Sequence, residues 1–326
     1  MENLLEVKHL KKYFNTKHGT LHAVDDISFT LQAGKTIGVV GESGCGKSTL
    51  GRAVIGLNEV TDGQIIFEGR DVTHLSLKER KKMVHDMQII FQDPFTSLDP
   101  RKSVFDLIAE PLKINHMTGS KDELTKRVIE LMDTVGLAKR FLYAYPHELD
   151  GGRRQRIGVA RALALEPKFI VCDEPVSALD VSIQAQILNL LQDLQEQRNI
   201  AYMFITHDLS VVRHISDEVM VMYVGTMFEK AEAQELFDHP IHPYTLGLLS
   251  AIPVPVVNKN KEKIIMAGEI SMPINPPAGC RFAGRCPFAT EACHTVTPEL
   301  EEPFPGHFVA CHNMREIHRD HNIVIP

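Results

Sequence analysis

A glycine-rich segment near the start of the chain has the residue types that bind phosphate. It follows the apolar run 37–40, and its glycines let successive backbone N–H groups turn toward phosphate oxygens. Lys47 can reach the β- and γ-phosphates of a nucleotide, and the Ser48 hydroxyl can ligate Mg²⁺. The segment therefore predicts a nucleoside triphosphate site. Its residues are Gly41, Glu42, Ser43, Gly44, Cys45, Gly46, Lys47, Ser48 and Thr49.

Two acidic residues end another apolar run, residues 169–172. We expect Asp173 to hold Mg²⁺ through water. Glu174, one residue further along an extended chain, points in another direction and is placed to polarise an attacking water as general base. A solvated strand end is the structural alternative. Pro175 follows at once, and beside a triphosphate the acid pair favours the chemical interpretation.

Short apolar runs alternate with helical patterns, and these elements must position the two motifs. Unbroken apolar runs suit strands buried on both faces, and a spacing of three and four residues gives a helix one apolar stripe. The sequence predicts an α/β fold with a phosphate-loop NTPase core, a mostly parallel sheet and helices on both faces. The expected strands are residues 37–40, 88–91, 169–172, 202–206 and 219–224. The clearest stripe is Ile183, Ile187, Leu190, Leu191 and Leu194.

Length and charge narrow the function classes. The 326 residues suffice for about two domains at roughly 150 residues each. A net charge of −7 argues against nonspecific binding to nucleic acid, so we expect no nucleic-acid partner. Apolar stretches stay far below the ~18 residues of a membrane span, and residues 1–12 lack the apolar core of a signal peptide. We therefore expect a cytosolic chain.

Further motifs stand around the phosphate loop and the acid pair in a fixed order. Gln92 follows the second expected strand, residues 177–180 (SALD) follow the acids, and His207 follows the fourth expected strand. Residues 149–156 (LDGGRRQR) precede the acid pair. This order, over about 170 residues, resembles the ATP-binding cassette family of transporter ATPases. Residues 149–156 are similar to that family's signature.

The resemblance implies a role for each matching residue. Gln92 resembles the residue that reaches Mg²⁺ and the attacking water, and His207 resembles the histidine that contacts the γ-phosphate. Asp180 lies in a segment similar to the loop that links two nucleotide sites across a dimer. Phe14 resembles the aromatic residue that stacks on adenine, with Tyr13 as the alternative. The implied Mg²⁺ ligands are Ser48, Gln92 and Asp173. The implied catalytic set is Lys47, Gln92, Glu174 and His207.

The family works as a head-to-tail pair, in which one chain's signature completes the other chain's site. Asp150, Gly151 and Gly152 would therefore contact a partner's ATP. The family usually has serine where this chain has Asp150 and glutamine where it has Arg153. An ionised aspartate repels the γ-phosphate unless Arg153 offsets its charge. We therefore predict a heterodimer with a related ATPase and unequal sites, with full compensation by Arg153 as the alternative.

Two segments narrow the resemblance to one branch. Residues 91–100 and 236–245 closely resemble the oligopeptide and dipeptide importers. Residues 95–160 correspond to an inserted helical subdomain that touches membrane subunits in that family. The resemblance implies two permease subunits, an extracytoplasmic solute-binding protein and a peripheral location on the cytoplasmic face of the membrane. Nickel chelates, opines and oligosaccharides are alternative cargoes within the branch.

Four late cysteines lie in a proline-rich tail. Twelve of the 18 prolines follow residue 236, which predicts a cassette domain over residues 1–235 and a small irregular, metal-binding extension over 236–326. The tail has too few apolar residues to fold unaided, and four thiolates suit either Zn²⁺ or a [4Fe–4S] cluster. His294 and His312 are alternative ligands. The resemblance favours the cluster. The four cysteines are Cys280, Cys286, Cys293 and Cys311.

Two other function classes compete with the importer ATPase. A soluble cassette ATPase that acts without membrane subunits usually has two cassettes or a long coiled-coil insertion, and this chain has one cassette and no such insertion. An iron–sulfur sensor with a vestigial cassette is the other alternative. The intact set of Lys47, Asp173, Glu174 and His207 argues against it.

Overall fold

A computed structural model describes residues 3–252, 266, 268 and 272–320. The contacts divide the chain into two compact units. The first unit combines the beginning of the chain with its end. Its segments are Met1–Leu31, Thr36–His74 and Thr206–Pro326. The second unit consists of Gln32–Lys35 and Leu75–Ile205.

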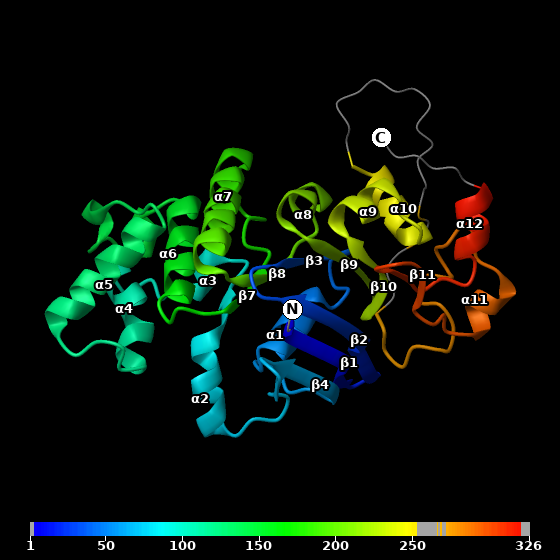
Figure 1. Ribbon diagram of the computed structural model, residues 1–326, viewed down its shortest axis with the longest axis horizontal. Coiled ribbons are helices and arrows are strands. Elements are labelled where there is room, and N and C mark those ends of the chain that lie inside the picture. The colour runs from blue at the N-terminus through cyan, green and yellow to red at the C-terminus, as the bar shows by residue number, and fades with distance from the viewer. Residues whose placement is uncertain (1–2, 253–265, 267, 269–271, 321–326) are drawn as a thin grey trace. The chain divides into compact units, whose positions relative to one another are not determined.

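The first unit begins with an antiparallel sheet in the order β2-β1-β4-β5 (Figure 1). Residues facing one side of β1 are buried, among them Leu5 and Val7, which pair in register with Phe67 and Ile65. Such strands alternate apolar and polar residues. A search for unbroken apolar runs therefore missed this sheet. The strands are β1 (Asn3–Thr16), β2 (Gly19–Gln32), β4 (Asp62–Phe67) and β5 (Arg70–Asp71).

A second group of strands in this unit has the order β11-β12-β10-β9-β3. Only β3 and β9 pair in parallel, and the other neighbours are antiparallel. The expected parallel pairing is confirmed at β3, and the antiparallel strands make the sheet mixed rather than mostly parallel. The strands are β3 (Thr36–Val40), β9 (Glu218–Tyr223), β10 (Thr226–Glu232), β11 (Glu301–Phe304) and β12 (His307–Val309).

Helices and aromatic side chains close the core of the first unit. Tyr223, Phe228, Tyr244 and Phe282 are buried in one cluster, which joins strands of the cassette to residues of the extension. The extension is therefore part of this unit's core. The helices are α1 (Lys47–Val54), α8 (Leu209–Ile215), α9 (Ala233–Asp238), α10 (Pro243–Ser250), α11 (Glu291–Thr295) and α12 (Met314–Asp320).

The second unit contains three parallel strands in the order β6-β7-β8. They are β6 (Met87–Ile90), β7 (Phe169–Asp173) and β8 (Ala201–Ile205), and every residue of β7 and β8 is buried, as expected for strands covered on both faces. The helices are α2 (Leu77–Asp86), α3 (Pro94–Ser97), α4 (Val104–Ile114), α5 (Lys121–Thr134), α6 (Gly151–Leu163) and α7 (Val181–Arg198). Short 3₁₀ turns occupy Lys139–Phe141 and Pro146–Glu148.

The predicted apolar stripe of α7 is confirmed in part: Ile187, Leu191 and Leu194 are buried. Ile183 and Leu190 are only half-buried. Helices α4, α5 and α6 contact one another and form the helical part of the second unit. The proposed limits of a subdomain at 95–160 and of a domain junction at residue 235 stay predictions. Within the part of the chain that the structure describes, no helix is both long and apolar enough to cross a bilayer.

Candidate functional site

The phosphate loop connects β3 to α1 and has a shape that only glycine allows at two positions. Gly46 precedes α1 with φ 104°, and a Cβ there would stand 2.1 Å from the Ala23 carbonyl oxygen. Gly41 has φ 151°, and its Cβ would stand 2.1 Å from the Met222 carbonyl oxygen. Both obstacles are backbone atoms that cannot move away as a side chain end can. The predicted strand, loop and helix are thus present in the expected order.

Lys47 is buried and held inside this loop. Its ammonium Nζ donates to the carbonyl oxygens of Gly41 at 2.8 Å and Glu42 at 2.9 Å. The neighbouring Cys45 thiol has a raised pKa because it is buried, so it stays neutral beside the lysine. Lys47 therefore supplies the loop with a fixed positive charge.

His207 follows β8 in sequence, and the residue before it is bonded to β3. The Thr206 N–H donates to the Val39 carbonyl oxygen at 3.1 Å, and the Asp208 N–H donates to the Thr206 hydroxyl at 3.1 Å. Asp208 in turn caps α8 by accepting from the Ser210 N–H at 2.8 Å. These bonds hold the backbone of His207 next to the strand that leads into the phosphate loop, and its side chain is exposed.

The second unit brings Gln92, Asp173 and Glu174 together. Gln92 Nε2 donates to Glu174 Oε2 at 2.8 Å, although 82 residues separate the two. Asp173 is buried at the end of β7, and Glu174 has a left-handed backbone with φ 48°. The Glu174 N–H donates to the Ile205 carbonyl oxygen at 2.9 Å. The chain thus turns sharply between the two acids, and the glutamine orients the second one.

The signature residues surround the start of α6. The Asp150 carboxylate caps this helix by accepting from the Arg153 N–H at 2.8 Å, and it forms an ion pair with the Arg153 guanidinium at 2.7 Å. Gly152 packs so tightly that a Cβ would stand 2.6 Å from the Ile183 side chain. Asp180 caps α7 in the same way by accepting from the Ile183 N–H at 3.0 Å.

The two candidate adenine-stacking residues differ in their surroundings. Tyr13 stacks on His22 with ring centroids 3.9 Å apart, and its hydroxyl donates to Asp25. Phe14 is 37% exposed, with the Lys12 ammonium 4.5 Å from the centre of its ring. Phe14 is thus the more exposed ring, whereas the Tyr13 ring is already stacked on His22, which favours Phe14.

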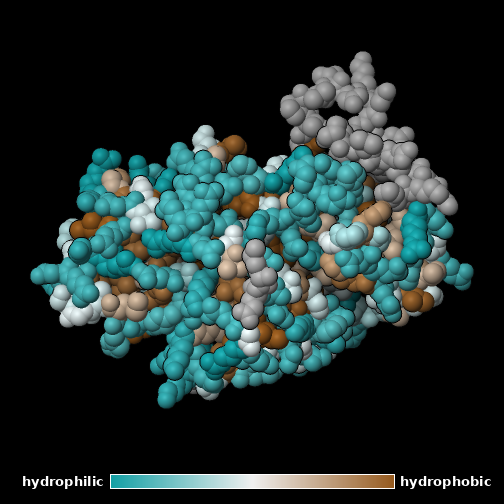
Figure 2. All heavy atoms as spheres, viewed as in Figure 1, coloured by the Kyte–Doolittle hydropathy of each residue, from teal (hydrophilic) through white to brown (hydrophobic). Residues whose placement is uncertain are grey.

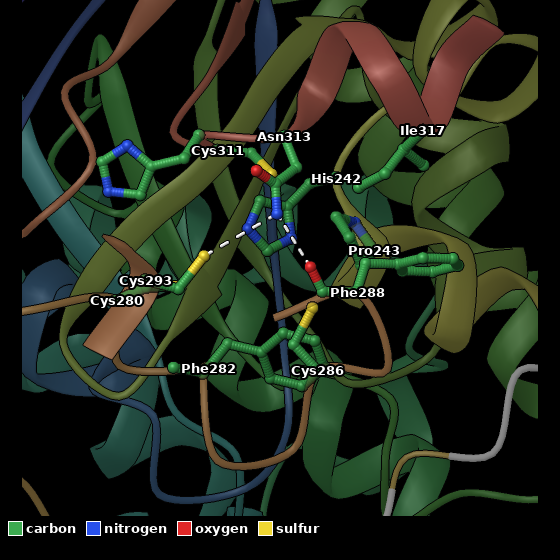
Figure 3. Close-up of a pocket in the computed structure, with 12 residues that line it drawn as sticks. His242, Pro243, Cys280, Phe282, Cys286, Phe288, Cys293, Cys311, Asn313 and Ile317 are labelled. Carbon is green, nitrogen blue, oxygen red and sulfur yellow. Dashed lines mark hydrogen bonds between the residues drawn. The ribbon is translucent and has the colours of Figure 1, made fainter. Parts of the chain in front are cut away.

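All four late cysteines line one cavity in the first unit (Figure 3). A hydrogen bond of 2.7 Å from the Cys280 N–H to the Cys293 carbonyl oxygen connects two of the segments that carry them. Burial raises the pKa of the Cys286 thiol to about 11 and that of Cys311 to about 12. The open space among the side chains is small, about 10 Å³, roughly the room of one water.

Among the described residues, no group of three or more histidine, cysteine, aspartate or glutamate side chains is close enough to hold a single metal ion. The expectation of a metal-binding extension is therefore not supported, and Zn²⁺ has no site in it as described. Neither histidine expected as an alternative ligand forms such a group. His312 instead bonds through Nε2 to the Val296 carbonyl oxygen at 2.9 Å.

Sequence reasoning missed two residues of the extension that contact the phosphate loop. The Arg285 guanidinium forms an ion pair with the Glu42 carboxylate at 2.7 Å. The Tyr244 hydroxyl accepts from the Glu42 N–H at 2.9 Å. More than 200 residues separate these partners in sequence. The only signal was the acid inside a loop that binds anions.

The predicted site residues are divided between the two units. The first unit holds Phe14, the phosphate loop 41–49, His207 and the four cysteines, and the second holds Gln92, Asp150, Gly151, Gly152, Asp173, Glu174 and Asp180.

Two family models match this chain. The model "ABC transporter" matches residues 24–177, and "Oligopeptide/dipeptide transporter, C-terminal region" matches residues 228–293. Among curated proteins, the chain is 51% identical to the oligopeptide transport ATP-binding protein AppF of Bacillus subtilis (strain 168), across 95% of this chain and 97% of AppF. It is 49% identical to the oligopeptide transport ATP-binding protein OppF of Salmonella typhimurium, across 94% of this chain and 95% of OppF.

Solved structures share the fold. The dimeric post-hydrolysis structure of the ATP-binding cassette MJ0796, bound to ADP and Pi, matches with a TM-score of 0.65 and 26% identity. That match covers 70% of this chain and 98% of the other. The structure of cbiO1 from Clostridium perfringens matches with a TM-score of 0.65 and 29% identity, across 73% of this chain and 92% of the other.

Proposed function

Because the chain belongs to the ATP-binding proteins of ABC transporters, in their oligopeptide and dipeptide branch, we propose that it hydrolyses ATP to drive peptide import. The observation that carries this proposal is the contact between Gln92 and Glu174 at the end of β7. It supplies an oriented carboxylate next to a second, buried acid. A phosphate loop with a buried lysine stands in the same chain.

Each site residue has its own role in phosphoryl transfer. Lys47 and the loop N–H groups bind the β- and γ-phosphates. Ser48, Gln92 and Asp173 would hold the Mg²⁺ that comes with ATP. Glu174 accepts the proton of the attacking water. Gln92 keeps the Glu174 carboxylate turned toward that water. His207 donates a hydrogen bond to the γ-phosphate.

A second ATPase chain completes each site. The start of α6 carries the glycines of the signature, and a helix N-terminus attracts the γ-phosphate of an opposing site. We keep the proposal of a heterodimer with a related ATPase. The ion pair and cap of Asp150 favour compensation by Arg153, because the carboxylate already has two donors from its own helix. This geometry weakens the hypothesis of two unequal sites.

The permease partners have a candidate docking surface in the second unit. A cleft of about 130 Å³ lies between β6 and α6, with Gln155 and Arg161 on its wall. Within the described residues, Gln155 Nε2 is buried without a hydrogen-bond partner. Burial also lowers the pKa of Arg161, whose guanidinium donates to the Ser97 carbonyl oxygen at 2.7 Å. A permease loop with apolar side chains and carbonyl or acidic acceptors fits this cleft.

Exposed apolar side chains extend this surface over the helical part of the second unit. Figure 2 shows hydrophobic residues among hydrophilic ones over α4 and α5. Ile114 is 68% exposed, and Met117 and Tyr143 are also exposed. Two permeases and a solute-binding protein would complete the importer, with this chain peripheral on the cytoplasmic face of the membrane.

For the cysteine cavity we propose a [4Fe–4S] cluster rather than a zinc ion. A cubane cluster spaces its four thiolate ligands more widely than one ion does, and four thiols around one apolar cavity are the donors it uses. Cys280, Cys286, Cys293 and Cys311 would hold it. The small open space requires these side chains to move apart, so the cluster would enter as the extension folds.

The cargo is tested in vesicles that contain this chain, its partner ATPase and the two permeases. ATP hydrolysis is measured with solute-binding protein loaded with a tetrapeptide, a nickel chelate, an opine or an oligosaccharide. We expect stimulation by the peptide-loaded protein alone. Stimulation by another cargo would identify that cargo, rather than peptide, as the substrate of the importer. Hydrolysis that depends on neither the permeases nor the cargo would indicate a soluble ATPase.

A further inference from the structure

The phosphate loop contains an acidic residue, Glu42, although its ligand is a polyanion. Glu42 follows the first glycine of the phosphate loop, and its carboxylate would repel bound phosphates if it were unpaired. Arg285 of the extension binds it with two hydrogen bonds, from Nη1 to Oε2 at 2.7 Å and from Nη2 to Oε1 at 3.1 Å. The arginine side chain is 11% exposed and the glutamate 24%, so water screens this pair only partly.

The backbone of Glu42 is held as well as its side chain. Its N–H donates to the Tyr244 hydroxyl at 2.9 Å, and its carbonyl oxygen accepts from the Lys47 ammonium at 2.9 Å. Three side chains therefore bond to Glu42, and two of them, Arg285 and Tyr244, belong to the extension. The position of Glu42 also sets where Lys47 lies, because the lysine is bonded to the Glu42 carbonyl.

Aromatic packing fixes both partners from the extension. The Arg285 guanidinium donates to the Tyr223 hydroxyl at 3.2 Å and lies 5.8 Å from the centre of that ring. Tyr223 packs edge-on against Tyr244 at 4.8 Å and against Phe282 at 5.3 Å between ring centroids. Such contacts leave Arg285 and Tyr244 little freedom to follow Glu42 if the loop moves.

A second arginine of the extension contacts β2, which pairs with the strand that carries Phe14. Arg281 forms an ion pair with Asp25 and donates to the Val224 carbonyl oxygen. The Asp25 carboxylate also accepts from the Tyr13 hydroxyl. Arg281 follows Cys280 directly, and Arg285 directly precedes Cys286. The segment between these two cysteines therefore contacts the phosphate loop through Arg285 and β2 through Arg281.

We propose that the C-terminal extension is a working part of the ATP site, in which Arg285 neutralises Glu42 and, with Tyr244, positions the phosphate loop. Arg285 acts through Glu42 and is a positioning residue, since it reaches the loop rather than the phosphates. Without it, an unpaired carboxylate remains beside the triphosphate and the loop loses one of its anchors. The extension would thus raise the affinity for ATP without contacting the nucleotide.

The test measures the Kd of the full chain for trinitrophenyl-ATP by fluorescence, alongside thermal unfolding. Arg285→Gln should raise Kd about tenfold, the effect of leaving one charged group unpaired. The double variant Arg285→Gln with Glu42→Gln should return to within about threefold of wild type, because no carboxylate is left to repel the phosphates. A role limited to shape would not be rescued by this second change.

Two further variants distinguish a specific effect on ATP binding from a folding defect. Tyr244→Phe keeps the aromatic packing, removes only the acceptor of the Glu42 N–H, and should raise Kd about threefold. Arg315→Gln changes an exposed arginine of the same extension, 4.0 Å from Glu301, and should leave Kd unchanged. Wild-type affinity in both Arg285→Gln and Tyr244→Phe would overturn the inference, as would a double variant as weak as Arg285→Gln. A wild-type chain that binds no nucleotide would instead contradict the ATPase itself.

Discussion

The phosphate loop and the cysteine cavity are two sites in one unit that are built in opposite ways. The loop is contiguous, and nine successive residues shape it through backbone angles and N–H groups. The cavity gathers four cysteines from a span of 32 residues, and only tertiary contacts bring their side chains together. A local site is encoded by a motif, whereas a dispersed site is encoded only by the fold that assembles it.

This contrast predicts that the two sites fail in different ways. A substitution at a loop glycine should weaken ligand binding and leave the fold intact, because the phosphate-binding shape depends on the loop's own backbone angles. A substitution in the cavity should remove the proposed cluster and loosen the extension. The ion pair between Arg285 and Glu42 connects the two sites, so a change in the extension can also alter the phosphate loop.

The largest effect is expected for Gly46→Ala, with Gly44→Ala as its matched control. Both glycines have positive φ, 104° and 80°, but only at Gly46 would a Cβ collide with backbone, 2.1 Å from the Ala23 carbonyl oxygen. Gly46→Ala should weaken ATP binding by about 100-fold or more, since strain and collision add. Gly44→Ala meets no atom within 4 Å and should cost about tenfold through strain alone.

Titration of the two variants with ATP in a calorimeter measures both affinities. Equal affinities would show that conformational strain, rather than the collision at Gly46, limits the loop.

The next effect concerns Cys286→Ser, compared with His312→Asn. Purified anaerobically, the wild-type chain should contain about four iron atoms and four sulfides, as a cubane cluster requires. Cys286→Ser should lose the iron and its brown colour and lower the unfolding temperature, because the extension loses its cross-link. His312→Asn should keep the iron.

Metal analysis and absorption spectra provide the measurement. Equimolar zinc without iron in the wild-type chain would reject the cluster, and iron retained in Cys286→Ser would remove this cysteine from its ligands.

The smallest effect is expected for Gln92→Leu, which removes one hydrogen bond to Glu174 and keeps similar volume. Its kcat for ATP hydrolysis should fall about tenfold, the worth of a hydrogen bond to a charged group, with Kd for ATP nearly unchanged. This variant tests a contact of the dispersed kind, because Gln92 and Glu174 are 82 residues apart in sequence. Steady-state phosphate release gives kcat, and titration with ATP gives Kd. An unchanged kcat would mean that Glu174 needs no orientation by Gln92.

The sequence allowed much of the local chemistry to be predicted. The strand before the phosphate loop, the stripe of α7 and the acids after β7 are contiguous patterns, and the structure has each of them. The N-terminal sheet escaped because alternating strands contain no long apolar run. Likewise, the pairing of β10 with β12 joins residues about 80 apart, which no local pattern records.

Side-chain partners were the least predictable part of the site. A partner close in sequence could be anticipated, because Asp150 pairs with Arg153 three residues further on, the compensation given above as the alternative. Glu42 looked like an ordinary loop residue, and its partner Arg285 lies 243 positions away. Spacing identifies which residues can do chemistry, but it does not identify the charges that neutralise them.

The proposed peptide import is tested most directly by peptide uptake in cells that carry Glu174→Gln in place of the native chain. The amide keeps the shape of Glu174 and cannot accept a proton, so ATP should bind while hydrolysis falls by at least about 100-fold. Uptake of a labelled tetrapeptide should drop to background, with uptake of the corresponding free amino acids unchanged. Peptide uptake at the wild-type rate would contradict the account.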